Sequence, residues 1–184
     1  MKIIWIFVLL VAGCVMIRAQ SAQPSLPRTV TAVFDRNVAS MERAILSVAE
    51  AMPEDRYAFV PVDGEFTGVR SFAQLVKHVA VDNYVDAAAL LKEKPPVDTG
   101  IHENGPDSIK TKKEILIMLR DSFTYLHKAM ATVNRRNLMQ PVDFPGTRGG
   151  IPRLMIVTAA LSHPWDLYGQ MIEYLRMNGI DPQK

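Results

Sequence analysis

Hydrophobic residues recur every three or four positions along four long stretches of the chain. This spacing places them on one face of a helix, so it predicts four amphipathic helices. The first helix is expected over residues 29–52, the second over 71–92, the third from 111 to about 133, and the fourth after Pro152 as far as Asn178. No stretch alternates as a half-buried strand does, and the pattern therefore predicts an all-α fold, a four-helix bundle.

Local signals at the helix ends agree with this pattern. Ser71–Gln74 and Thr111–Glu114 each form the sequence of a capping box, in which two side chains satisfy free backbone amides at a helix start. Pro53 ends the first helix because it cannot continue the backbone hydrogen bonds. Gly179 follows the last helix, where a left-handed residue is common.

Three connecting segments, 53–70, 97–110 and 141–152, are rich in glycine, proline and aspartate and are expected to be loops. They are longer than a minimal bundle needs, which is consistent with a cleft at one end or with plain insertion. The glycines of the last segment lack the lysine and hydroxyl residue of a phosphate-binding loop. A flexible connection is the favoured interpretation of this segment.

The first residues differ from the rest of the chain. Met1 and Lys2 precede an almost unbroken apolar run over residues 3–17, and small residues follow at Ala19 and Ala22. This pattern predicts a signal peptide over 1–22, followed by a tether at 23–28 and a single bundle domain at 29–184. Because the apolar run is short for a bilayer span, we expect export to the periplasm or secretion, with no stable membrane span after processing.

Cys14 is the only cysteine of the chain, and Val11–Cys14 resembles the acylation site of bacterial lipoproteins. The apolar residues 15–17 continue beyond it, however, which favours cleavage near Ala19 or Ala22 over lipoprotein anchoring. A chain cut there contains no cysteine and therefore no disulfide, so its stability must come from packing.

Charge excludes some partners. Removal of residues 1–19 takes away Lys2 and Arg18, which leaves 19 of the 21 basic residues against 19 acidic ones. A balanced charge gives no electrostatic argument for binding nucleic acid or an anionic membrane surface. The expected partner is an unidentified small molecule, and a homodimer is also compatible with a bundle.

Two segments carry a resemblance to a known family. R-S-F-A-Q-L-V-K-H-V-A at 70–80 and L-S-H-P-W-D-L-Y-G-Q at 161–170 are similar to the DinB-like (DinB/YfiT) four-helix bundles, which are described as candidate metalloenzymes. The resemblance implies a divalent metal, such as zinc, nickel or manganese, held by one histidine of the second helix and two of the last. The first two positions correspond to His78 and His163, and the third corresponds to Leu167.

Leu167 leaves two functional interpretations open. A catalytic zinc-type site needs three protein ligands, and leucine has no donor atom. The favoured hypothesis is therefore an incomplete site in a degenerate binding or structural module. The alternative is a metal-dependent hydrolase or transferase that uses His78 and His163 with Asp166, or another ligand such as His127 of the third helix. Pro164 is expected to disturb the direction of His163, because proline inside a helix removes a backbone hydrogen bond.

Overall fold

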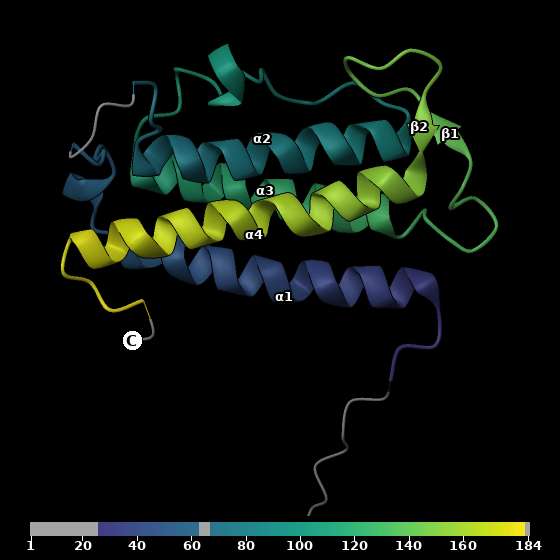
Figure 1. Ribbon diagram of the computed structural model, residues 1–184, viewed down its shortest axis with the longest axis horizontal. Helices are drawn as coiled ribbons and strands as arrows, with labels where there is room; N and C mark the ends of the chain where they lie inside the picture. Colours follow the sequence, from purple (N-terminus) through teal and green to yellow (C-terminus); the bar gives the residue numbers. More distant parts are fainter. Residues whose placement is uncertain (1–25, 63–66, 183–184) are drawn as a thin grey trace, which may run out of the picture.

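The computed structural model describes residues 26–62 and 67–182, which form a bundle of four long helices (Figure 1). The helices are α1 (Val30–Ala51), α2 (Phe72–Leu91), α3 (Lys112–Met130) and α4 (Arg153–Met177). The connections contain two 3₁₀ helices, η1 (Glu54–Arg56) and η2 (Ile101–Glu103), and two strands, β1 (Pro141–Val142) and β2 (Ile151–Pro152). The predicted four-helix bundle is confirmed. The expected signal peptide lies outside the described residues.

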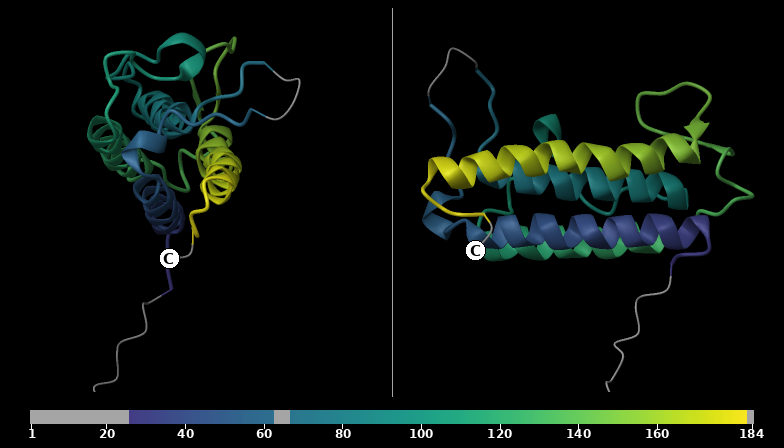
Figure 2. Two further views of the ribbon diagram at one scale, coloured as in Figure 1. Left: turned by 90° about the vertical axis from the view of Figure 1, so that its left-hand side faces the viewer. Right: turned by 60° about the horizontal axis from the view of Figure 1, so that its bottom comes forward.

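The four helices stand at the corners of a square when the bundle is viewed along its axis (Figure 2). α2 and α3 run in the same direction, so the segment between them must return along the whole bundle, and it does so over the outer side of α2 (Figure 1). We call residues 92–111 the crossover. It leaves α2 covered by the bundle on one side and by the crossover on the other.

The double cover of α2 explains its unusual burial. The bundle core contains the expected apolar stripes, and its largest fully buried side chains include Phe72, Phe123, Met41 and Ile45. Besides its apolar residues, α2 also buries polar side chains, namely Lys77, His78, Asn83 and Asp86. Buried polar groups cost free energy unless they are paired. The crossover supplies partners for Lys77 and His78, and α3 supplies one for Asn83 through Ser122.

Both predicted capping boxes are present. The Ser71 hydroxyl accepts a hydrogen bond from the Gln74 amide, and the Gln74 side chain accepts one from the Ser71 amide. Thr111 and Glu114 form the same reciprocal pair at the start of α3. These caps fix the register of α2 and α3, and the register of α2 decides which of its side chains face the site described below.

The connection before α4 differs from the prediction. β1 and β2 form a short antiparallel pair instead of a flexible connection, with Val142 opposite Ile151. Gly150 has a φ of +74°, and a Cβ atom at this position would lie 2.8 Å from the Val142 carbonyl oxygen. The glycine therefore allows a close approach of two backbones, which the sequence pattern did not reveal.

None of the helices in the described ranges is both long enough and apolar enough to span a bilayer.

Candidate metal centre

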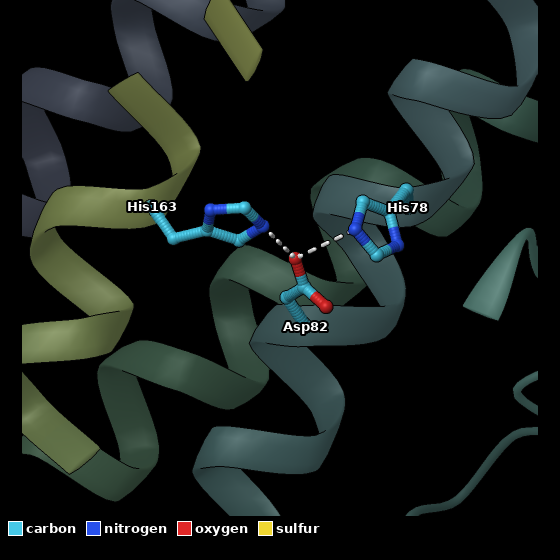
Figure 3. Close-up of side chains that lie close together, drawn as sticks. All are labelled: His78, Asp82 and His163. Carbon is cyan, nitrogen blue, oxygen red and sulfur yellow. Dashed lines mark ion pairs between the residues drawn. The ribbon is translucent and has the colours of Figure 1, made fainter. Parts of the chain in front are cut away.

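His78, Asp82 and His163 converge between α2 and α4 (Figure 3). The Asp82 Oδ2 atom lies 3.6 Å from Nε2 of His78 and 3.6 Å from Nε2 of His163. One ligand atom from each of the three residues lies within 4.8 Å of the others. The structure thus brings together the two histidines that the sequence singled out, and it adds a carboxylate between them.

The helical framework accounts for this convergence. His78 and Asp82 are four residues apart, so they share one face of α2. His163 comes from the middle of α4, which packs against α2. Pro164 is accommodated inside α4, which runs unbroken through it, and the His163 ring still lies 5.8 Å from the His78 ring, centroid to centroid.

The distances within the group suit a shared cation better than direct hydrogen bonds. A separation of 3.6 Å is too long for a hydrogen bond between an imidazole and a carboxylate. Asp82 Oδ2 is buried and has no hydrogen-bond partner in the described part of the chain. Neighbouring ligands of a tetrahedral zinc ion stand roughly 3.3 Å apart, given metal–ligand bonds of about 2.0–2.1 Å. The two distances of 3.6 Å from Asp82 Oδ2 to the histidine nitrogens are therefore close to the spacing of ligands around such an ion.

The backbone of the crossover sets the orientation of His78. Its Nδ1 atom lies 2.9 Å from the carbonyl oxygen of Glu103, so the Nδ1–H group donates to this oxygen. The Nε2 lone pair then points toward Asp82, as a ligating nitrogen must. Burial is the main cause that lowers the pKa of His78 below its ordinary value, and this favours the neutral imidazole that binds metals.

Two glycines shape the turn that presents the Glu103 carbonyl. Gly100 has a φ of +71°, and a Cβ atom there would lie 2.1 Å from the Gly105 carbonyl oxygen. His102 and Glu103 also have positive φ values, 55° and 59°. Positive φ is costly for residues with a side chain, so neighbouring contacts must hold this turn in place.

Arg70 and Lys77 provide those contacts. Arg70 donates from Nε to the Asn104 side chain and from its guanidinium to the His102 carbonyl. Lys77 Nζ donates to the carbonyl oxygens of Pro106 and Ile109. The crossover is thereby fixed, on both sides of the carbonyl that orients His78, to Lys77 of α2 and to Arg70, which precedes the N-cap of this helix.

Asp82 occupies an environment that disfavours its negative charge. Burial, with a contribution from the charge of Glu103, raises the pKa of Asp82 to about 7, although the nearby Arg70 acts in the opposite direction. A carboxylate held in such a position is stabilised by a bound cation, since the cation supplies the compensating charge. The electrostatics of the group therefore agree with its geometry.

The other predicted ligands lie elsewhere. Asp166 is exposed, accepts a hydrogen bond from Gln170 at 3.3 Å, and does not belong to the converging group. Leu167 is buried and packs in the hydrophobic core. His127 faces α1, where its ring nitrogens contact the carboxylates of Asp35 and Glu42 at 2.5 and 3.3 Å. Thus α3 contributes no ligand to the group.

Two features of the site were not predicted from the sequence. Asp82 follows His78 by four residues, a spacing that could have marked it as a ligand on the same helix face. The Glu103 carbonyl has no side-chain signature, and only the glycines at positions 100 and 105 mark the turn that carries it.

The fold and the site define a four-helix bundle with a candidate metal centre of two histidines and one aspartate. The chain belongs to the DinB superfamily, because the model of that family matches residues 38–171. Its structure is similar to the crystal structure of a DinB-like protein from Bacillus cereus, with a TM-score of 0.63 and 14% sequence identity over 85% of this chain and 97% of that one. At this identity the likeness shows the fold alone. The chain has no significant match among curated proteins.

One further carboxylate, Asp86, lies buried one helical turn beyond Asp82. Burial, assisted by the charges of Asp82 and Glu103, raises its pKa from the ordinary 3.8 to about 8. The pKa of Asp86 is higher in the folded than in the unfolded state. At pH values between 3.8 and about 8, the protein therefore takes up a proton when it folds. The contribution of Asp86 to stability is therefore greatest at low pH and decreases as the pH rises toward 8.

Asp86→Asn should remove this pH dependence. In metal-free protein the variant should gain stability relative to the wild type as the pH rises from 4 to 8. The gain should reach on the order of a few kcal/mol, because a tenfold change in proton affinity corresponds to about 1.4 kcal/mol. Urea unfolding at several pH values in the presence of a chelator measures the difference. The exposed Asp143→Asn serves as control, and a difference for Asp86→Asn that stays constant with pH would contradict the assignment.

Proposed function

We propose that this chain is an exported DinB-superfamily domain that binds a divalent metal through His78, Asp82 and His163. The observation that carries the proposal is the buried Asp82 Oδ2 atom, which has no hydrogen-bond partner in the described residues and lies 3.6 Å from a ring nitrogen of each histidine. Two imidazole nitrogens and a carboxylate oxygen are a ligand set typical of catalytic zinc and related ions.

Asp82 changes the significance of Leu167. The family resemblance places a third histidine at position 167, where this chain has a buried leucine. Asp82 supplies a donor atom from the opposite helix, so the site need not be degenerate. The donor set becomes two nitrogens and one oxygen in place of three nitrogens, which favours harder divalent ions more than a three-histidine site would.

The geometry supports a metal-dependent hydrolase or transferase as the reaction class. The side chain of His163 is 50% exposed, whereas that of His78 is 6% exposed, so the group is closed on the α2 side and open to solvent beside α4. A bound divalent metal would supply Lewis-acid chemistry at this opening. His78 and Asp82 would keep the ligand atoms in position, and a small-molecule substrate would approach past His163.

A binding or structural module is the second candidate. It is favoured by Leu167, which belongs to the hydrophobic core and leaves α4 with a single ligand. Under this hypothesis the domain binds a metal, or a small molecule at the same opening, without turnover. The two candidates differ in catalysis and share the fold.

Metal binding is tested by isothermal titration of untagged apoprotein with zinc, nickel and manganese. Asp82→Asn and His163→Ala should each weaken binding by about a hundredfold or more, because loss of an outer-sphere partner alone typically costs 10–100-fold. Asp166→Asn is the matched control, since this exposed aspartate lies on the same helix as His163 and outside the group. Wild-type affinity in Asp82→Asn would exclude the proposed ligand set.

Catalysis is tested with the metal-loaded protein and a panel of activated esters and amides. The hydrolase hypothesis predicts turnover that disappears on chelation and in His163→Ala, since both changes remove the metal from the site. Stoichiometric metal without turnover on any of these substrates would favour the binding module over the hydrolase.

Export is tested by N-terminal sequencing of the protein isolated from its host. A chain that begins near Gln20 or Gln23 supports the signal peptide expected from residues 1–22. An unprocessed chain in the cytosolic fraction would contradict it.

A further inference from the structure

Arg70 connects the turn of the crossover to both helices that carry the candidate ligands. Its backbone carbonyl oxygen accepts a hydrogen bond of 3.0 Å from the hydroxyl group of Tyr174 in α4. Tyr174 is buried and lies eleven residues after His163, which is about three helical turns, so both side chains point to the same side of α4. The backbone of Arg70, just before α2, is thereby fixed to the helix that supplies His163.

The side chain of Arg70 holds the turn that orients His78. Its Nε atom donates to the Asn104 side chain at 2.8 Å, and its Nη2 atom donates to the His102 carbonyl oxygen at 2.9 Å. These two acceptors belong to the residues on either side of Glu103, whose carbonyl oxygen receives the Nδ1–H group of His78. The guanidinium group therefore brackets the one carbonyl that sets the direction of the imidazole.

Two acceptors in this arrangement suit an arginine in particular. Nε and Nη2 lie on one edge of a rigid planar group, so the second bond forms with little further loss of conformational freedom. The turn needs such a contact, since His102 and Glu103 have positive φ values of 55° and 59°, which are unfavourable for residues with a side chain. Without the guanidinium group the turn would be free to relax and to carry the Glu103 carbonyl away from His78.

The charge of Arg70 also acts on the candidate centre. Burial, the largest influence, lowers the pKa of His78 and raises that of Asp82, whereas the positive charge of Arg70 acts to lower the pKa of both. A lower pKa favours the neutral imidazole of His78 and the ionised carboxylate of Asp82, which are the forms that bind a metal. The charge of this arginine therefore supports what its hydrogen bonds do.

We infer that Arg70 is a positioning residue of the candidate metal centre. Through Tyr174 it is tied to the helix of His163, and through the turn at residues 102–104 it sets the direction of His78. The two imidazoles thus keep their relative position through one residue that contributes no ligand atom. This role rests on the metal binding proposed above, because a positioning residue acts only through the ligands that it positions.

The direct readout is the tautomer of His78 in the metal-free protein. Nitrogen-15 chemical shifts of the imidazole distinguish Nδ1–H from Nε2–H, and the wild type at neutral pH should show Nδ1–H, because this group donates to Glu103. Arg70→Met removes both side-chain bonds and keeps the backbone carbonyl that binds Tyr174. In this variant we expect a mixture of the two tautomers, which a loss of stability would not produce while the protein remains folded.

Metal affinity should change together with the tautomer. Titration of apoprotein with zinc should show binding that is about 10–100-fold weaker in Arg70→Met, the range typical for loss of an outer-sphere partner. Arg70→Lys should restore little of this loss, because one ammonium group cannot hold both acceptors as the edge of a guanidinium group does. Guanidinium ion at millimolar concentration should recover part of the Nδ1–H tautomer in Arg70→Ala, because it supplies the missing donors.

Arg56→Met is the matched control. The side chain of Arg56 is 60% exposed and pairs with Asp55 of η1 at 3.8 Å, so its removal should leave both the tautomer of His78 and the zinc affinity unchanged. Circular dichroism of all variants verifies that the helices are intact.

Three results would overturn the role of Arg70. The first is Nδ1–H as the only tautomer of His78 in Arg70→Met, the second is a tautomer mixture with wild-type zinc affinity, and the third is an equal change in Arg56→Met. Failure of the proposed metal binding looks different, because the wild type itself would then bind no zinc, nickel or manganese. The tautomer in Arg70→Met would still show in that case whether this arginine orients the imidazole.

Discussion

The site depends on one hydrogen bond from a side chain to the backbone, the contact from the His78 ring to the Glu103 carbonyl at 2.9 Å. This contact fixes which nitrogen of the ring carries the proton and which one faces Asp82. It exists because α2 and α3 run in the same direction, so the crossover has to pass over α2. The chain topology and the chemistry of the candidate metal centre are linked through this single carbonyl.

Because α2 is covered on two sides, its polar side chains differ in where they find hydrogen-bond partners. Lys77 finds two carbonyls of the crossover, and Asn83 donates to Ser122 of α3. Asp82 Oδ2 and Asn83 Oδ1 receive no hydrogen bond from the described residues. Of these two oxygens, Asp82 Oδ2 lies 3.6 Å from a ring nitrogen of each of two histidines, which is a position suited to a cation.

Much of the fold could be predicted because it depends on local signals. Helical periodicity and the capping residues at Ser71 and Thr111 gave boundaries within a few residues of the observed ones. The turn chemistry of the connections was harder to predict, because it depends on contacts between distant backbones. Gly150 lies in a segment whose composition indicated flexibility, whereas its positive φ serves a close approach to Val142.

The site was predicted in part, and the family resemblance supplied that part. The motif that carries it identified His78 and His163, since those positions match the pattern of the DinB-like family. Asp166 was the nearest carboxylate to His163 along the chain, but helix geometry turns it to solvent. Asp82 completes the group from another helix, and no pattern within α4 could reveal it.

The direction of the His78 imidazole in the candidate centre depends on the turn between Gly100 and Gly105, two residues that have no side chains. A relative that keeps both histidines and the aspartate but replaces one of these glycines would hold its imidazole at a different angle. The direction of the His78 imidazole in the candidate centre can therefore change through backbone shape alone, at positions that a comparison of the three site side chains would pass over.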